Sequence, residues 1–372
     1  MSKADIVVIG AGMAGASLAA EIGGRASVVL VEAEAQPGYH STGRSAAFWS
    51  ESYGGPFVQP LTTASGRFLE SPPADFHDRG FLSPRGAISV AEAASRAELA
   101  AQYETFSAAG VELEWLERAA LERRISGLRP QWIAGLSEPT CSDIDVAALH
   151  AAYLRAARRR GVDVRTDSRV TGLRRSAGRW QLATGSGNLE ADVVVDAAGA
   201  WADPVAKLAG VRAIGIQPYR RTIAQLRTDP AAPSDLPLII DVRGEFYFKP
   251  ESGGRLWLSP HDESPCPACD VQPEELDVAT AIDRFEHVVD WKVERVERRW
   301  AGLRSFAPDR LPVYGFADGV PGFFWCAGQG GFGIQTAPAA AKLAASMLLG
   351  SAPDPLVADI DPTPYLAGRF IS

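Results

Sequence analysis

The chain has 372 residues, of which 46% are hydrophobic and 22% are charged, and these values exclude a mostly disordered protein. Its 45 acidic and 37 basic residues give a net charge of −8, which disfavours a nucleic-acid-binding protein. Four cysteines are too few for a disulfide scaffold. No apolar stretch is long enough to span a bilayer, and the glycine-broken N-terminus lacks the features of a signal peptide. We therefore expect a cytoplasmic protein, with peripheral contact to the inner membrane left open.

A strand, a glycine turn and a helix open the sequence. Asp5–Ile9 is a short run of apolar, β-branched residues, which is typical of a strand buried on both faces. Met13–Ile22 has the small residues of a closely packed helix, and Ala26–Val31 repeats the buried-strand pattern before Glu32. The order strand, glycine turn, helix, strand predicts a βαβ unit.

The turn of this unit has the spacing GxGxxG at Gly10, Gly12 and Gly15. The first glycine permits a tight turn, the second lets a pyrophosphate approach the backbone, and the third lets the helix pack closely on the strand. Free N–H groups at the helix N-terminus favour a phosphate, and the Glu32 carboxylate can accept hydrogen bonds from an adenosine ribose. The sequence therefore predicts a dinucleotide site. Because no second such turn is present, we expect no separate nicotinamide site.

Helices and buried strands alternate through the next part of the chain. Pro37–Gly55 is rich in Gly, Ser and Thr, which predicts a long loop with one helical turn. Glu190–Gly199 is a fully buried strand that ends in glycine. The other expected elements are helices over Ala91–Ala109 and Ala147–Arg160 and short strands at Val162–Arg165, Arg169–Leu173 and Trp180–Thr184.

Residues 213–300 differ in character from the rest. Strand-like runs separated by Gly and Pro turns predict an antiparallel region. Phe323–Ala327 and Ala337–Leu349 then return to a buried strand and a helix, and the proline-rich tail from Pro353 is expected to pack loosely. The runs within the antiparallel region are Pro237–Val242, Glu245–Lys249 and Leu256–Ser259.

Together these patterns predict an α/β protein in which a Rossmann-type domain is interrupted by an antiparallel-sheet substrate domain. We assign residues 1–85, 140–212 and 301–372 to the first domain and residues 86–139 and 213–300 to the second. Both domains are therefore discontinuous in sequence.

Five motifs in order along the chain resemble those of the D-amino-acid oxidase superfamily of FAD enzymes. They are GAGMAGAS, PGYHSTGRSAA, VVDAAGAWAD, WAGLRSFAPD and GQGGFGIQTAP. The chain is most similar to the bacterial D-arginine dehydrogenase branch, which it also resembles at His150–Arg155 and Asp270–Thr280. The resemblance implies that the Rossmann-type domain binds FAD and that the protein is an oxidoreductase of amino acids.

The same resemblance implies which residues bind FAD. We expect the flavin to be non-covalent, because Leu303–Asp309 has no cysteine where sarcosine-oxidase-like relatives attach it. The expected cofactor-binding residues are Gly10, Gly12, Ala14, Gly15, Glu32, Ala33, Ser41, Thr42, Gly43, Arg44, Ser45, Ala46, Ala47, Val170, Gly199, Gly330, Phe332, Gly333, Ile334, Gln335 and Thr336.

An amino-acid oxidoreductase must hold the substrate carboxylate, and an arginine fork binds both of its oxygens in one plane. Arg221, Tyr247 and Arg304 match carboxylate-binding positions of the resembling branch, Arg220 is an alternative to Arg221, and Tyr53 is retained. The Gly331 carbonyl can accept a hydrogen bond from the substrate amine. We expect no obligatory general base, because a positive clamp lowers the pKa of the bound amine and water can take the proton.

The expected side-chain pocket departs from the resembling branch. The D-arginine enzymes have a histidine at the position of Phe48 and a glutamate, which meets the guanidinium, at that of Ala87. Without that carboxylate a buried cationic side chain would lack a partner, so we expect neutral, apolar or aromatic D-amino acids as substrates. A carboxylate supplied from elsewhere in the fold is the alternative.

Other functions stay open at this point. The same fold could oxidise a secondary amine of the sarcosine or glycine type or a 2-hydroxy acid, or the chain could be a flavoprotein without turnover. The electron acceptor could be a quinone, another carrier or O2.

The cysteines predict no metal site. Cys266 and Cys269 form a CxxC in a proline-rich loop without a second pair or a nearby histidine, which favours an inert loop over a redox or metal role. Cys141 and Cys326 are expected to be buried thiols.

Overall fold

β1 (Ser2–Ile9) lies at the centre of the first sheet. It pairs in parallel with β12 (Gly187–Asp196) on one side and with β2 (Val28–Val31) on the other. Ile6–Ile9 is buried, as a strand covered on both faces requires. The computed structural model describes residues 2–370 of the chain, and within them α1 (Met13–Ile22) connects β1 to β2. The predicted βαβ unit is confirmed.

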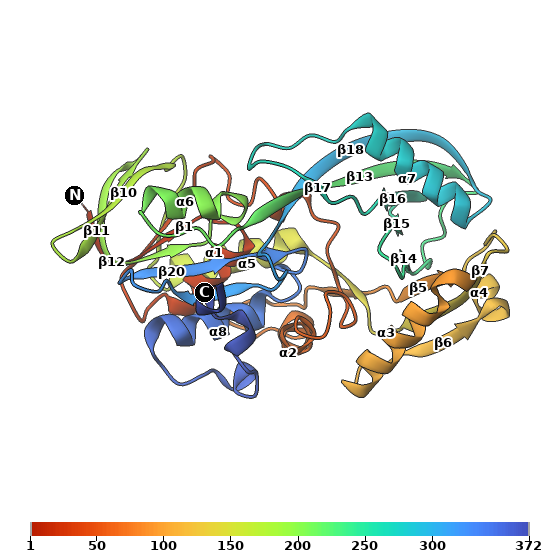
Figure 1. Ribbon diagram of the computed structural model, residues 1–372, viewed down its shortest axis with the longest axis horizontal. Helices are drawn as coiled ribbons and strands as arrows, with labels where there is room; N and C mark the ends of the chain where they lie inside the picture. The colour runs from red at the N-terminus through yellow and green to blue at the C-terminus, as the bar shows by residue number, and fades with distance from the viewer. Residues whose placement is uncertain (1, 371–372) are drawn as a thin grey trace.

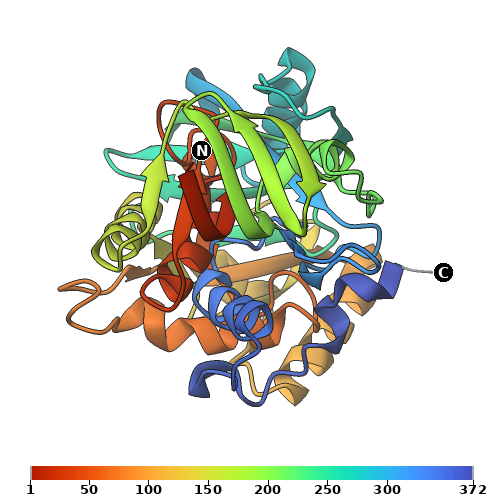
Figure 2. The same cartoon turned by 90° about the vertical axis from the view of Figure 1, so that its left-hand side faces the viewer.

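The first sheet has eight strands within residues 2–370. β10, β11 and β12 form an antiparallel meander at one edge, which faces the viewer in Figure 2, and β20 extends the parallel part from the end of β12. The remaining strands are β9 (Asp163–Arg165), β10 (Val170–Ser176), β11 (Arg179–Thr184), β19 (Val313–Phe316) and β20 (Phe323–Ala327).

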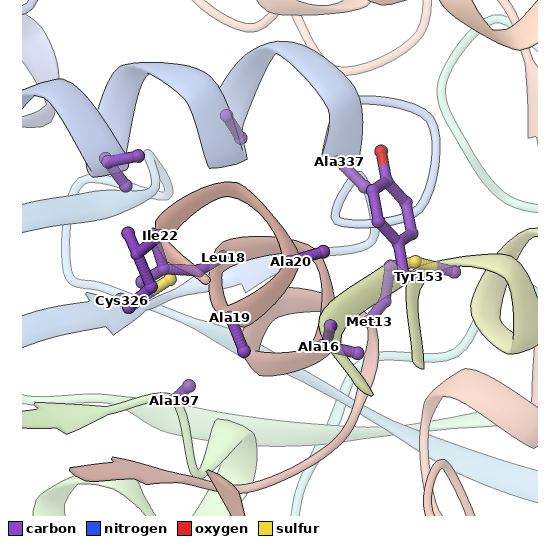
Figure 3. Packing of buried hydrophobic residues seen from close by; sticks show 14 of the residues in the cluster. Met13, Ala16, Leu18, Ala19, Ala20, Ile22, Tyr153, Ala197, Cys326 and Ala337 are labelled. Carbon is purple, nitrogen blue, oxygen red and sulfur yellow. The ribbon is translucent and has the colours of Figure 1, made fainter. Parts of the chain in front are cut away.

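Three helices form the main core against this sheet. α1 contacts both α5 (Val146–Arg159) and α8 (Ala337–Leu349). Figure 3 shows alanines, Leu18 and Ile22 of α1 in this cluster, with Tyr153 of α5 and Cys326 of β20. Small residues let the three helices approach closely, and the cluster fixes the N-terminus of α1 relative to the sheet.

The second sheet has ten strands within the described residues and lies beside the first, on the right of Figure 1. α7 (Glu275–Val288) contacts three of its strands, β13, β16 and β18. In spatial order the path is β21 (Gln329–Gly330), β18 (Lys292–Phe306), β13 (Gln217–Asp229), β16 (Arg255–Ser259), β15 (Tyr247–Glu251), β14 (Leu238–Asp241), β5 (Ala87–Glu92), β7 (Trp132–Glu138) and β6 (Glu114–Glu117), and β17 (Ser264–Pro265) pairs with β13.

β13 and β18 connect the two parts of the molecule. They have 13 and 15 residues and pair antiparallel along nearly their whole length (Figure 1). At the end nearer the first sheet, β18 also pairs with β21, where Ser305 faces Gly330. Residues on these strands are therefore held next to the glycine turn that precedes α8.

Smaller elements complete the fold. A three-stranded sheet is formed by β3 (Phe48–Trp49), β8 (Ser142–Ile144) and β4 (Leu82–Pro84). The other helices are α2 (Gln59–Glu70), α3 (Arg96–Ala108), α4 (Arg118–Arg124) and α6 (Ala202–Leu208), and the 3-10 turns are η1 (Thr42–Arg44), η2 (Ala93–Ser95), η3 (Gly199–Trp201), η4 (Pro355–Val357), η5 (Thr363–Tyr365) and η6 (Ala367–Phe370).

The structure corrects three expectations. The predicted helix over Ala91–Ala109 begins only at Arg96, because the preceding β5 is paired between β7 and β14. The second sheet is not purely antiparallel, since β14 and β5 are parallel, and α7 lies within the region predicted as strands. The tail is packed rather than loose: Tyr365 is 2% exposed, and its hydroxyl donates to the Phe57 carbonyl at 2.7 Å.

The mixed α/β fold class is confirmed. Both segments assigned to the substrate domain, residues 86–139 and 213–300, contribute strands to the second sheet, and the exact domain limits stay predictions. Within residues 2–370, no helix combines the length and the apolar character needed to cross a membrane.

The core of the second sheet gives a stability prediction. Phe248 is fully buried, and its ring centre lies 5.1 Å from that of Phe285 in α7. We expect Phe248→Ala to lower the free energy of unfolding by about 3–5 kcal/mol, because it leaves a cavity between sheet and helix. The matched control is Leu276→Ala in α7, since Leu276 is 73% exposed and its loss should change stability by less than about 0.5 kcal/mol. Urea titration of both variants measures this, and equal effects would contradict the assignment of the core.

Candidate functional site

The glycine turn between β1 and α1 is tight for steric reasons. Gly10 has φ +100°, and an added Cβ would lie 2.6 Å from the Ala197 carbonyl oxygen. An added Cβ on Gly15 would lie 1.9 Å from the Gly10 carbonyl oxygen. Gly12, at the N-cap of α1, has no side chain to cap the helix, and the Met13 N–H donates to the Thr42 hydroxyl at 3.0 Å, which places Thr42 at the helix N-terminus. The turn thus has the form that a bound pyrophosphate needs.

Glu32 is fixed by the backbone of this turn. Its Oε2 accepts from the Ala11 N–H at 2.8 Å, and its Oε1 accepts from the Glu34 N–H at 3.0 Å. The carboxylate therefore stands at the end of β2, beside the glycine turn, where the sequence predicts a ribose contact.

A single long cavity runs from Glu32 and the edge strand β10 to Arg304 and Tyr247 on the second sheet. Most of the predicted cofactor residues line it, namely Gly10, Gly12, Ala14, Glu32, Ala33, Ser41, Thr42, Arg44, Ser45, Ala46, Val170, Gly199, Gly330, Gly333 and Ile334. The predicted residues outside this lining are Gly15, Gly43, Ala47, Phe332, Gln335 and Thr336.

The Arg44 guanidinium is bound by other parts of the chain. Its Nη1 donates to the carbonyls of Val271 at 3.0 Å and Ala301 at 3.2 Å, and its Nη2 forms an ion pair with Asp270. The guanidinium thus ties the loop before β3 to the second part of the molecule.

Arg221 and Arg304 lie on one face of the β13–β18 pair. Arg304 faces Tyr219 across the ladder, and Arg221 is two residues along the same strand from Tyr219, so both side chains point to the same side. Arg221 is 3% exposed; its Nε donates to the Asp262 carbonyl at 2.9 Å and its Nη2 to Glu263 at 3.2 Å. Among residues 2–370, its Nη1 has no hydrogen-bond partner. This buried donor is available to an anion.

The structure favours Arg221 over Arg220 as the partner of Arg304 in the expected carboxylate clamp, which is called the clamp below. Arg220 is neutralised by ion pairs with Glu274 and Asp277 away from the cavity. Burial, with the charge of Arg304 adding to it, lowers the pKa of Arg221 to about 10, so Arg221 is still cationic near neutral pH. In the described part of the chain, no carboxylate is within ion-pair distance of Arg304. Arg221 is itself paired with Glu263 at 3.2 Å, so among these residues the unpaired charge of the clamp is that of Arg304.

Tyr53 joins the clamp through two hydrogen bonds. Its hydroxyl accepts from Arg304 Nη1 at 2.6 Å and lies 3.2 Å from His261 Nε2. Because His261 Nδ1 lies 2.5 Å from the Gly244 carbonyl, Nδ1 bears the proton and Nε2 accepts from Tyr53. Burial acts to raise the pKa of Tyr53, but the charges of Arg304 and Arg221 outweigh it and lower that pKa.

His261 and Glu138 are site residues that the sequence did not indicate. Glu138 is 2% exposed and holds the segment before Tyr53, accepting from Ser50 Oγ at 2.8 Å and from the Glu51 N–H at 2.6 Å. Gln335 Nε2 donates to the Tyr53 carbonyl at 3.0 Å. The only local signal for His261 is a polar residue two positions after the buried end of β16, and for Glu138 there is no local signal.

Gly331 lies against Arg304. An added Cβ on Gly331 would lie 2.6 Å from Arg304 Nη1, so a larger residue there would displace the guanidinium. Gly331, Arg304, Arg221 and Tyr247 all line the same end of the cavity.

Phe48 and Ala87 do not line the cavity. They are 7% and 5% exposed, in an apolar cluster with Tyr247 and Ile223. The Phe48 ring centre lies 5.0 Å from that of Tyr53. This side of the clamp is therefore closed by packed apolar side chains.

The neutral state of His261 gives a prediction about pH. Burial and the charges of Arg221 and Arg304 hold its pKa well below the ordinary value of 6.5. Between these two pKa values the unfolded chain binds a proton that the folded protein does not, so the free energy of unfolding decreases as the pH falls below about 6.5. We expect His261→Gln to flatten this decrease in urea titrations between about pH 7 and about pH 5. A variant that loses stability as steeply as the wild type would contradict this account.

Comparisons with known proteins agree with the geometry. The model of the family described as FAD dependent oxidoreductase matches residues 5–347. The chain is 27% identical over 396 residues to mitochondrial dimethylglycine dehydrogenase from Rattus norvegicus, covering 98% of this chain but 45% of that protein, so it spans under half of that relative's length. It is 24% identical over 359 residues to glycine oxidase from Geobacillus kaustophilus, covering 92% of each.

A crystal structure of glycine oxidase from Geobacillus kaustophilus has the same fold, with a TM-score of 0.86, 22% identity and 100% of both chains covered. The expected resemblance is thereby confirmed at the level of the family, and the likeness to the D-arginine dehydrogenase branch stays a prediction. Because the family match extends from β1 to the last core helix, the chain belongs to the DAO family of FAD-dependent oxidoreductases.

Proposed function

We propose that this flavoenzyme oxidises the Cα–N bond of a neutral α-amino acid. The observation that supports this most directly is the pair of guanidinium groups of Arg221 and Arg304 on one face of the β13–β18 ladder. Within residues 2–370, Arg221 Nη1 is a buried donor without a partner and no carboxylate is within ion-pair distance of Arg304. Burying such charge without a partner costs several kcal/mol, so an anionic ligand group is the natural occupant. A substrate carboxylate fits that requirement.

We further propose how the chain holds FAD. Glu32 and Val170 take the adenosine end, the turn at Gly10 and Gly12 takes the pyrophosphate, and the segment from Gly330 to Ile334 takes the flavin end. When bound, FAD supplies the acceptor for the hydride that leaves the substrate.

The residues of the clamp orient the amino acid. Arg304 and the free Nη1 of Arg221 donate to the carboxylate, while Tyr53 and Tyr247 border it. The Gly331 carbonyl accepts from the amine and directs its lone pair, so that Cα–H faces the cofactor end of the cavity. The positive clamp favours loss of the ammonium proton to water. For a primary amine the product is a 2-imino acid, which water converts to a 2-oxo acid and ammonia.

A neutral substituent on the substrate is favoured over a cationic one. Glu138 faces Ala87 across the β5–β7 pair, close to where the D-arginine branch has its glutamate. However, both carboxylate oxygens of Glu138 already accept bonds from Ser50, Glu51 and Ser52. A guanidinium or ammonium side chain would therefore meet Ile223 and Tyr247, through which the apolar cluster of Phe48 and Ala87 borders the cavity, and would find no partner there.

Two substrate classes are compatible with this pocket. The first is D-amino acids with apolar or aromatic side chains. It is supported by the match of Tyr53, Arg221, Tyr247 and Arg304 to site positions of the resembling branch. Glycine and N-substituted glycines are the second, because Phe48 and Ala87 are packed and leave little room beside the clamp. The names of the relatives, dimethylglycine dehydrogenase and glycine oxidase, support the second class.

Anaerobic bleaching of the holoenzyme near about 450 nm tests the reaction directly. The panel contains D- and L-alanine, D- and L-phenylalanine, glycine, sarcosine, D-arginine and a 2-hydroxy acid. We expect bleaching by neutral D-amino acids or by glycine and sarcosine, with D-arginine the weakest. Fastest bleaching by D-arginine would contradict the neutral pocket. Bleaching by the hydroxy acid alone, or by none of the panel, would contradict amine oxidation.

The clamp is tested with the best substrate of that panel. Arg304→Lys keeps the charge but loses the planar fork and the bond to Tyr53, so we expect kcat/KM to fall by about 10- to 100-fold. Arg298→Lys is the matched control, because Arg298 is exposed on the same strand. An equally active Arg304→Lys variant would contradict the carboxylate clamp.

The glycine turn at Gly10 and Gly12, which is the proposed cradle for the pyrophosphate, gives a prediction about FAD affinity. Gly10→Ala places a Cβ at φ +100° and 2.6 Å from the Ala197 carbonyl oxygen. We expect strain of about 1–3 kcal/mol and FAD binding weaker by about tenfold or more, measured by flavin fluorescence during titration of the apoprotein. Gly172→Ala in β10 is the control, since its Cβ would make an ordinary contact at 3.5 Å. Unchanged FAD affinity of Gly10→Ala would contradict the proposed cradle.

A further inference from the structure

Cys266 and Cys269 face each other in the loop after β17. Both thiols are free and partly accessible, whereas Cys141 and Cys326 are buried. The two Sγ atoms are 3.7 Å apart, so they need to approach by about 1.7 Å to form a disulfide of about 2.05 Å. We expect a change of side-chain rotamer together with a small shift of the loop to allow that approach.

One end of this loop is held more firmly than the other. The Cys266 N–H donates to the Pro218 carbonyl at 3.0 Å, and the preceding Ser264–Pro265 is paired with β13. Pro265 and Pro267 further restrict the backbone around Cys266. Closing the disulfide is therefore expected to pull Cys269 and the residues after it toward Cys266.

The residues after Cys269 are those that hold Arg44. Asp270 forms the ion pair with Arg44 and accepts from the Tyr39 hydroxyl at 3.3 Å, and the Val271 carbonyl accepts from Arg44 at 3.0 Å. The thiols also pack in a cluster with Trp201. Arg44, Tyr39 and Trp201 line the long cavity, so a shift of this loop reaches the wall of the proposed cofactor site.

We propose that Cys266 and Cys269 form a reversible disulfide that weakens the hold of the chain on FAD by displacing Asp270 and Val271 from Arg44. The oxidant is a low-molecular-weight disulfide. One cysteine, as thiolate, attacks it and forms a mixed disulfide, which releases one small thiol. The second cysteine then attacks the mixed disulfide, closing the internal S–S bond and releasing the second small thiol. The two protons lost by the protein are taken up by the two leaving thiolates, and two electrons pass to the oxidant.

The surroundings of the pair suit a reversible bond rather than a structural one. A ring this short removes little entropy from the unfolded chain, so the disulfide adds little stability and is readily reduced. Burial and the neighbouring Cys269 thiol raise the pKa of Cys266, so Cys266 is mostly in the thiol form near neutral pH and its attack on an oxidant is faster at alkaline pH. Among residues 2–370, no group of three or more metal-ligating side chains includes this pair.

Thiol counting on the holoprotein tests whether the disulfide forms. The protein is equilibrated in glutathione buffers of rising disulfide content, quenched with acid, alkylated and digested with trypsin. We expect two of the four cysteines to escape alkylation, both in the peptide Leu256–Arg284. In the control variant Cys141→Ala the same peptide should remain protected. Full alkylation of this peptide in excess oxidised glutathione would overturn the proposal.

FAD titration of the apoprotein tests the effect of the bond. We expect the dissociation constant of oxidised wild type to be several-fold larger than that of reduced wild type. The double variant Cys266→Ser/Cys269→Ser should show no such difference, and Asp270→Asn should bind FAD as weakly as the oxidised form. Equal dissociation constants for oxidised and reduced wild type would overturn the coupling. Because neither readout involves an amino-acid substrate, failure of the proposed reaction leaves this test unaffected.

Discussion

The guanidinium groups of Arg221 and Arg304 share one face of a β-ladder, and no carboxylate neutralises Arg304 within the described residues. Charge buried in this way is costly, and the surrounding groups show its influence. It lowers the pKa of Tyr53 against the effect of burial and adds to burial in keeping His261 neutral. An amino-acid carboxylate would pair with the positive charge on this face, and the proposed chemistry depends on that pairing.

The ladder also sets the position of this charge relative to the cofactor cavity. The two arginines lie on β13 and β18, near the end of the second sheet where β21 pairs with β18. Gly331 follows directly, and an added Cβ there would collide with Arg304. The proposed substrate clamp and the glycine turn of the flavin end are therefore parts of one hydrogen-bonded structure. In an FAD-dependent oxidoreductase, where a hydride must leave a carbon held next to the flavin, such rigidity is worth several kcal/mol of activation free energy.

The apolar side of the clamp bears on the proposed preference for a neutral substrate. Ala87 stands across the sheet from Glu138, whose carboxylate is used to hold Ser50, Glu51 and Ser52 and thereby the segment that ends in Tyr53. Negative charge is thus present close to the pocket but is committed to positioning a clamp residue. A cationic side chain would have to compete with those hydrogen bonds, whereas a neutral one would not.

The sequence by itself determined the βαβ unit, the glycine turn and Glu32, because these depend on local spacing and on steric limits that only glycine meets. Most of the cofactor residues that it indicated, through motifs contiguous in the chain, line the cavity. Only the tertiary structure decided the helix start at Arg96, the packed tail, the orientation of Arg44, and the contacts of His261 and Glu138. Each of these depends on partners distant in the chain, such as Asp270 for Arg44 and Tyr53 for His261, and local spacing does not encode such pairs.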